Sequence, residues 1–382
     1  MPDDHHTPCE NPLWPCAMTG AVACLAGFED VAVIVHGSSG CYFYPASLVG
    51  VPIHGTFLVE NEVIFGTESR LREVIGELGD RYSRIAVVNT CVPAIMGEDT
   101  GSLARDGRIL VVDSPGFLGD LEAGYHRALA EVAPEVDPDA PGVNIDGVCR
   151  TDPFCRGNTL EARRLLNLAG AAVGTTFCLD RYAATRRAAP LTVGTNPDLA
   201  SGVGTWCGSL LGLDAVDETF AALAAVVDGI ETRPIEEEIA WADAKIKKAC
   251  DKYLRRFDPP RVAICAGRSY ADFAAGMLKQ YLDADIACIA ARNDAASRTA
   301  DFSTVRGMIR DAEPDLILGS SYERAICGDA AFVGLTSPLR GKVLLHSRAV
   351  AGVEGALWLM DEVLNACTNR NRRPRSPGKD SL

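Results

Sequence analysis

Short runs rich in valine and isoleucine alternate along the chain with longer stretches whose apolar residues recur every three or four positions. The short runs predict buried strands, and the longer stretches predict amphipathic helices. This alternation is typical of parallel sheets joined by right-handed crossovers. The predicted strands are Val31–Val35, Arg84–Asn89, Ile109–Asp113, Val143–Ile145, Val173–Phe177, Leu191–Gly194, Val262–Cys265, Ile286–Ile289, Asp315–Gly319 and Lys342–Leu345, and the predicted helices include Thr19–Phe28, Glu68–Leu78, Asp120–Val132, Thr159–Leu168 and Ala271–Tyr281.

The number of predicted strands exceeds what one doubly wound domain usually holds. The sequence therefore predicts an α/β protein with two to three Rossmann-like parallel-sheet domains around a central cleft. We expect an N-terminal domain over residues 1–135, a second domain over 136–234, a linking helix over 235–257 and a C-terminal domain over 258–367. Residues 368–382 are basic and contain prolines, which predicts a tail without regular structure.

Three cysteines lie where a predicted element meets a turn. Cys16 precedes the first predicted helix, Cys41 ends a glycine-rich turn after the first predicted strand, and Cys91 follows the second predicted strand. Residues at the carboxyl ends of parallel strands point into the crevice where such folds bind ligands. Three converging thiols are the ligand type that iron–sulfur clusters require. The alternative is that each thiol is a small buried apolar group.

The segments around these cysteines resemble the opening of nitrogenase component 1 proteins, especially the β-type subunit. The resemblance implies that Cys16, Cys41 and Cys91 bind an iron–sulfur cluster, of the 4Fe–4S type or larger. It is carried by CAMTGAVACLAGFE at 16–29, HGSSGC at 36–41, ENEVIFG at 60–66 and NTCVPAIMGED at 89–99, and more weakly by VNIDG at 143–147, PDLILG at 314–319 and GVEGALW at 352–358.

The three cysteines leave a cubane cluster one protein ligand short. Candidate additional ligands are Cys9, Cys207 and His346, and an acidic side chain is a further alternative. Clusters of the family that this chain resembles lie at a subunit interface and take ligands from two chains. The resemblance therefore implies a homodimer, or a heterodimer with a related component 1 chain.

Other cysteines and histidines have less specific settings. Cys24 falls in the apolar stripe of the first predicted helix, which favours core packing. Cys149 and Cys155 flank a predicted loop, where a structural role, a cavity-lining role and a ligand role are all open. His36 opens the glycine turn before Cys41, and we expect it to orient that turn through hydrogen bonds.

The sequence contains no GxxxxGK[ST] loop, and GVGTWCG at 202–208 has one residue too many for GxGxxG, so we expect no bound ATP or NAD. A net charge of −14 argues against nucleic acid as a partner. No apolar run approaches a membrane span, and the 14 cysteines without a signal-like N-terminus indicate reduced thiols in a cytoplasm.

Electrons must then come from another protein. The resemblance implies a separate iron protein-like ATPase as the donor and an oxidoreductase that reduces a small molecule or a tetrapyrrole in the inter-domain cleft. No catalytic residue is assigned, although acidic side chains near the cysteine motifs are candidate proton donors. A non-catalytic scaffold for metallocofactor assembly and an unrelated α/β binding protein remain open alternatives. The acidic residues are Glu60, Glu62, Glu98 and Asp99.

Overall fold

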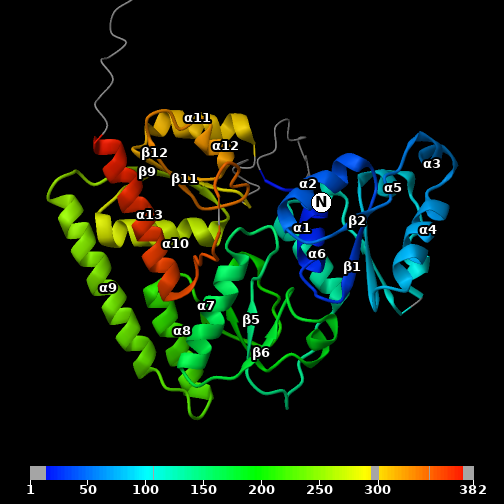
Figure 1. Ribbon diagram of the computed structural model, residues 1–382, viewed down its shortest axis with the longest axis horizontal. Coiled ribbons are helices and arrows are strands. Elements are labelled where there is room, and N and C mark those ends of the chain that lie inside the picture. Colours follow the sequence, from blue (N-terminus) through cyan, green and yellow to red (C-terminus); the bar gives the residue numbers. More distant parts are fainter. Residues whose placement is uncertain (1–13, 106, 294–300, 344, 373–382) are drawn as a thin grey trace, which may run out of the picture.

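The computed structural model describes residues 14–372, apart from residues 106, 294–300 and 344. The described chain forms three α/β domains, each built on a four-stranded sheet in which all strand pairs are parallel (Figure 1). This confirms the predicted fold class. The sheets are β2 (His54–Gly55), β1 (Val31–His36), β3 (Arg84–Asn89) and β4 (Ile109–Asp113); β6 (Val173–Thr176), β5 (Val143–Asp146), β7 (Leu191–Gly194) and β8 (Thr205–Ser209); and β10 (Asp285–Ala291), β9 (Arg261–Ala266), β11 (Leu316–Gly319) and β12 (Ala331–Gly334).

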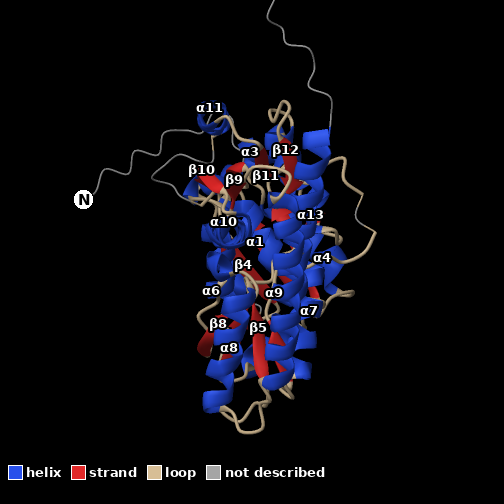
Figure 2. Cartoon of the chain, turned by 90° about the vertical axis from the view of Figure 1, so that its left-hand side faces the viewer, coloured by secondary structure: helices blue, strands red, loops and turns tan. Residues whose placement is uncertain are grey.

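All three sheets follow the same connectivity, because in each the first strand lies between the second and the third. Figure 2 shows the strands enclosed by helices. The helices of the N-terminal domain are α1 (Ala17–Leu25), α2 (Ser39–Val49), α3 (Glu60–Phe65), α4 (Glu68–Gly79), α5 (Cys91–Met96) and α6 (Leu121–Val132), with the short 3-10 turns η1 (Gly101–Arg105) and η2 (Gly116–Leu118). The rest of the described chain contains the helices α7 (Cys155–Leu168), α8 (Leu213–Val226), α9 (Arg233–Leu254), α10 (Arg268–Leu282), α11 (Phe302–Ala312), α12 (Ser321–Arg324) and α13 (Gly352–Arg372), with the 3-10 turns η3 (Tyr182–Arg187) and η4 (Pro197–Leu199).

Helix α1 is buried along its whole length, so the prediction of an amphipathic helix was wrong at this position. It packs closely on α6 through two glycines. A Cβ added to Gly20 would lie 1.8 Å from the Leu121 carbonyl oxygen, and one added to Gly124 would lie 1.7 Å from that of Ala17. Only glycine allows the two backbones to approach this closely. Helix α1 is therefore fixed between its own sheet and its neighbours.

The last helix, α13, packs against α9 and α7 and thus ties the C-terminal end of the chain to the middle domain. It continues through Arg372, although the sequence predicted a tail without regular structure from residue 368. The guanidinium of Arg370 pairs with Asp315 at 2.8 Å, which anchors the last turn. Residues 373–382 lie outside the described part of the chain.

One predicted strand was wrong. Lys342, Val343 and Leu345 lie in a loop, where Val343 and Leu345 are 79% and 91% exposed. The third sheet is instead completed by β12, and the sequence also missed β2 and β8. Among the described helices, none combines the length and apolar character that crossing a bilayer requires.

Candidate functional site

The three predicted ligand cysteines all lie at the starts of helices. Cys16 is the N-cap of α1, Cys41 is in the first turn of α2, and Cys91 is the first residue of α5. Strands β1 and β3 lead into α2 and α5 and are neighbours in the sheet, with His36 paired to Asn89 at their carboxyl ends. The parallel register therefore places the starts of α2 and α5 side by side.

The thiols of Cys16 and Cys91 meet at Gly116, in the loop after β4. The Gly116 N–H donates to Cys91 Sγ at 3.2 Å. A Cβ added to Gly116 would lie 3.0 Å from Cys16 Sγ and 3.4 Å from Cys91 Sγ. Burial raises the pKa of the Cys41 thiol, and the Cys91 and Cys16 thiols raise it further, while the Ser38 hydroxyl, 3.7 Å from Cys41 Sγ, opposes them. The fold thus gathers all three thiols, and their role as ligands stays a prediction.

Two buried polar atoms beside the thiols have no hydrogen-bond partner among the described residues. They are Asn89 Oδ1, two residues before Cys91, and Ser114 Oγ, two residues before Gly116. Buried polar atoms are nearly always partnered in native proteins. Both atoms lie in the segments that lead into Cys91 and Gly116, so these segments leave hydrogen-bonding capacity unused within the described structure.

The arrangement is too open for a single ion. Within the described ranges, no three His, Cys, Asp or Glu side chains approach closely enough to hold one metal ion. A cluster differs because its cysteines bind separate iron atoms. The described thiols are therefore not placed as a mononuclear metal site requires.

His36 supports the glycine turn before Cys41 through hydrogen bonds rather than joining the three thiols. Its imidazole is fully buried, with Nδ1 3.1 Å from Thr56 Oγ1 and Nε2 2.9 Å from Thr67 Oγ1. Thr56 also accepts from the Gly37 N–H at 3.0 Å. Burial lowers the pKa of His36, with the Glu98 carboxylate opposing this shift. The neutral ring thus orients the glycine turn, as the sequence predicted.

Two of the candidate additional ligands, Cys207 and His346, are described, and neither is placed with the triplet. Cys207 lies on β8 in the middle domain, and His346 is exposed in the loop before α13. No contact joins either side chain to the three thiols within the described structure, and Cys9 lies outside it. Cys149 and Cys155 are buried, and burial raises the pKa of each to about 12, which favours structural thiols.

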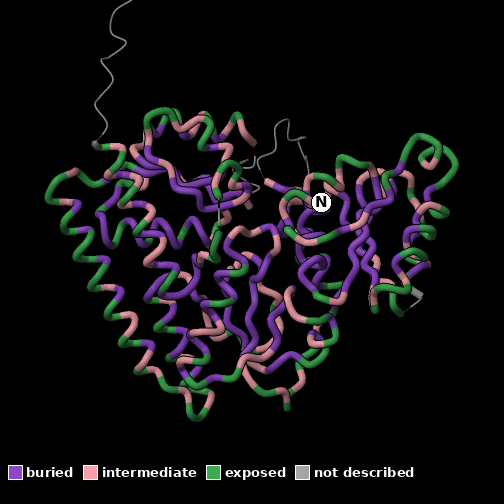
Figure 3. Tube along the Cα trace, viewed as in Figure 1, coloured by how far each residue is buried: buried purple, intermediate pink, exposed green. Residues whose placement is uncertain are grey.

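An exposed apolar surface adjoins the thiols. Ile64 and Phe65 at the end of α3 and Ile95 on α5 are 69%, 84% and 76% exposed. Figure 3 shows α3 among the exposed segments of the N-terminal domain. An open hollow of about 760 Å³ runs along this surface and is lined by Ser38, Leu58, Val59, Glu60, Asn61, Val63, Ile64 and Val92. Its lining includes a neighbour of Cys91 and the N-cap of α2.

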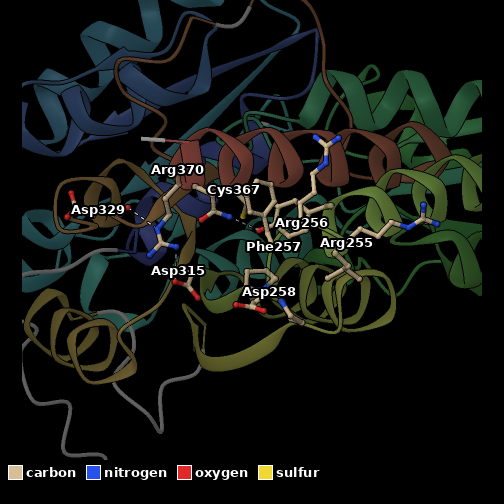
Figure 4. A pocket seen from close by; sticks show the side chains of 13 residues that line it. Arg255, Arg256, Phe257, Asp258, Asp315, Asp329, Cys367 and Arg370 are labelled. Atoms are coloured by element: carbon tan, nitrogen blue, oxygen red, sulfur yellow. Dashed lines mark hydrogen bonds and ion pairs between the residues drawn. The ribbon is translucent and has the colours of Figure 1, made fainter. Parts of the chain in front are cut away.

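A second hollow, of about 790 Å³, lies elsewhere (Figure 4). It is bounded by Pro260 and Asp315, which immediately precede β9 and β11, and it contains the Arg370–Asp315 ion pair. Parallel α/β sheets bind ligands at the opposite, carboxyl edge. This hollow therefore does not belong to the cysteine site.

Two contacts that the sequence did not predict link the site to the rest of the molecule. Tyr44 of α2 lies near Tyr322 of α12, and burial, then Tyr322, then Cys16 raise its pKa. Glu122 is buried in the first turn of α6 and accepts from Trp14 Nε1 at 2.7 Å. Burial raises the pKa of Glu122 to about 8. A glutamate in the first turn of a helix normally faces solvent. The only sign in the sequence that Glu122 is buried is the tryptophan near Cys16.

The fold and the cysteine site define a class of three-domain α/β proteins with thiols at a sheet edge. A family model described as nitrogenase component 1 type oxidoreductase matches residues 16–368. The chain belongs to this family, as the motifs around the cysteines indicated.

Similar proteins agree with this assignment. The chain is 29% identical over 201 residues to the nitrogenase molybdenum-iron protein beta chain of Sinorhizobium fredii, a match that covers 44% of this chain and 37% of the relative. It is 34% identical over 126 residues to the nitrogenase iron-molybdenum cofactor biosynthesis protein NifE of Rippkaea orientalis, covering 28% of this chain and 27% of the relative. The matched segments thus span 37% of the first relative and 27% of the second.

A solved structure named nitrogenase Cp1 at pH 6.5 superimposes with a TM-score of 0.78. The superposition covers 97% of this chain and 96% of that chain, at 15% sequence identity. At this identity the likeness establishes the fold.

Proposed function

We propose that this chain is the cluster-carrying component of an iron–sulfur reductase of the nitrogenase component 1 type. In this proposal Cys16, Cys41 and Cys91 ligate a 4Fe–4S or larger cluster, which when bound supplies single-electron transfer. The observation that carries it is the meeting of the Cys16 and Cys91 thiols at Gly116, with Cys41 beside them.

The residues around the thiols fit such a cluster. Gly116 has no side chain, so no methyl group crowds Cys16 Sγ at this position. The Gly116 N–H donates to Cys91 Sγ. Donors of this kind stabilise thiolates bound to iron. The Ser114 hydroxyl, two residues before Gly116, is buried without a partner among the described residues and is a second potential donor.

The exposed apolar surface of α3 and α5 supports a second subunit over the site. Large apolar side chains that face water next to a functional site are typical of interaction surfaces. A homodimer, or a heterodimer with a related chain, would cover Ile64, Phe65 and Ile95. The partner would also supply the cluster ligands that the three cysteines of this chain do not provide.

The electron donor in this proposal is a separate iron protein-like ATPase, since the sequence carries no phosphate-binding loop of the GxxxxGK[ST] type. The substrate is a small molecule or a tetrapyrrole bound between the domains. The Tyr44–Tyr322 contact supports this placement, because it connects the helix that carries Cys41 to the C-terminal domain.

Iron and sulfide analysis after purification without oxygen tests the proposal. We expect Cys16→Ala, Cys41→Ala and Cys91→Ala each to lose most of the iron, because a methyl group cannot replace a thiolate ligand. Cys327→Ala is the matched control, since Cys327 is also partly exposed but lies in the C-terminal domain. Full iron content in all three site variants would refute the proposal.

A scaffold for metallocofactor assembly is the second candidate function. It is favoured by the similarity to a protein named for cofactor biosynthesis, which is the more identical of the two relatives. Reduction assays with an iron protein-like ATPase separate the two functions. ATP-dependent turnover of a candidate tetrapyrrole supports the reductase, whereas transfer of the bound cluster to an apoprotein without turnover supports the scaffold.

A further inference from the structure

A buried pair of thiols lies between the N-terminal and middle domains, away from the site described above. Cys24 on α1 and Cys178, which follows β6, place their Sγ atoms 3.3 Å apart. Both side chains are 0% exposed. This separation is shorter than ordinary contact between two sulfur atoms and corresponds to an S–H···S hydrogen bond.

The surroundings hold the two thiols opposite each other. The Tyr125 hydroxyl donates to the Val148 carbonyl at 2.8 Å and lies 3.1 Å from Cys178 Sγ. A Cβ added to Gly27 would lie 1.7 Å from the Cys178 carbonyl oxygen, so the end of α1 touches the backbone of this residue. Cys178 also has a φ of +55°, a conformation that side chains adopt only where the surroundings impose it.

We propose that Cys24 and Cys178 are a modification site at which a peroxide forms a disulfide between the two domains. Each thiol loses its hydrogen, the sulfur atoms bond, and the O–O bond of hydrogen peroxide breaks to give two water molecules. The sulfur atoms must approach by little more than about 1 Å to reach the disulfide bond length. Neither cysteine belongs to the proposed ligand set, so this inference does not depend on the cluster.

Burial sets the rate of this reaction. The attacking species is a thiolate, and burial together with the Cys178 thiol raises the pKa of Cys24 well above its usual value. Oxidation in the folded protein therefore waits for local separation of α1 from the Cys178 loop. Once formed, the bond fixes the helix that begins at Cys16 to the middle domain.

Peptide mapping tests the proposal on the full-length protein. The protein is treated with hydrogen peroxide in native buffer and in moderate urea, alkylated under denaturing conditions and digested without reductant. We expect a cross-linked peptide containing Cys24 and Cys178, formed faster in urea. We also expect the oxidised protein to melt about 5 °C higher than Cys24→Ser treated in the same way, because the bond closes a long loop.

The matched control is Cys149→Ser. Cys149 is the third buried thiol of this region, but it contacts Thr151 Oγ1 at 3.1 Å, so its removal is expected to leave the cross-link unchanged. Recovery of Cys24 and Cys178 as free alkylated thiols in both buffers would overturn the proposal. A cross-link from Cys24 to Cys149 instead of Cys178 would overturn it as well.

Discussion

The N-terminal and C-terminal domains share one strand order but fill the carboxyl ends of their sheets differently. In the C-terminal domain, Ser320 follows β11, and both its N–H and its hydroxyl donate to Glu323 at 2.7 Å. Glu323 also pairs with Arg292, which follows β10. Both charged side chains are buried, so the protein closes this end with its own ion pair.

The corresponding end of the N-terminal domain is not closed in this way. Asn89 Oδ1 and Ser114 Oγ are buried without a partner among the described residues, and the Cys16, Cys41 and Cys91 thiols remain partly exposed. Two sheets with the same strand order thus differ at this end, because the N-terminal one leaves two buried polar atoms without a described partner. The difference locates the site more sharply than the cysteines alone.

The largest effect is expected where the C-terminal ion pair is broken. Glu323→Ala leaves Arg292 buried without its carboxylate and should lower the free energy of unfolding by about 3–5 kcal/mol. Urea denaturation measures this loss, and iron per folded protein should stay at the wild-type level. The double variant Glu323→Leu with Arg292→Met should recover much of the stability. A loss of iron without a loss of stability would contradict the comparison.

Glu122 gives the N-terminal domain a buried carboxyl whose effect depends on pH. Its pKa of about 8 in the folded protein lies above the ordinary value of 4.5, so the folded state retains a proton that the unfolded state releases. The contribution of Glu122 to the free energy of unfolding is fully present below pH 4.5. It is lost as pH rises to 8, at up to about 1.4 kcal/mol per pH unit.

Urea denaturation at several pH values between 5 and 8 tests this expectation. Glu122→Gln keeps an acceptor for Trp14 Nε1 and should remove this component of the pH dependence. An unchanged slope in the variant would show that Glu122 does not retain its proton.

Gly116 tests whether the open end is the cluster site. Gly116→Ala places a methyl group 3.0 Å from Cys16 Sγ and should displace the thiols, with most of the iron lost and stability lowered by no more than about 1 kcal/mol. Gly76→Ala is the control, because no atom lies within 4 Å of the added Cβ in α4. The Gly76→Ala variant should keep the iron, and its free energy of unfolding should rise by about 1 kcal/mol. Equal iron in both variants would argue against the site.

The smallest effect is expected at the end of α13. Deletion of residues 369–382 removes the Arg370–Asp315 pair and the hydrogen bond from Asn371 to Tyr253. The deletion should lower the free energy of unfolding by about 1 kcal/mol. The predicted tail without regular structure would have no such contacts to lose. Truncation after Arg372 keeps both contacts and is the control in a thermal unfolding experiment. Equal midpoints for the two truncations would show that these contacts add nothing.

Much of the fold was predictable because strands buried on both faces are continuous apolar runs. The bounds of β3, β4 and β7 agree with those predicted from the sequence. Strand β8 was missed because its residues form no apolar run and are partly exposed at a sheet edge. The apolar Lys342–Leu345 run misled the prediction because its described residues lie in an exposed loop.

The site was only partly predictable. Cysteines where a predicted element meets a turn indicated Cys16, Cys41 and Cys91, and the fold brings their thiols together. The sequence did not indicate Gly116 or Ser114, because their proximity to the thiols depends on how the loop after β4 packs. Tertiary contacts between distant segments leave no local pattern that periodicity or spacing detects.

The placement of one cysteine on each of α1, α2 and α5 fixes an order of events in the cell. The three residues are far apart in the sequence and meet only after β1, β3 and β4 have paired. A nascent or unfolded chain therefore offers no assembled set of thiols. Assembly of the full set of thiols therefore requires folding of the N-terminal domain, so metal binding and folding of this domain are coupled.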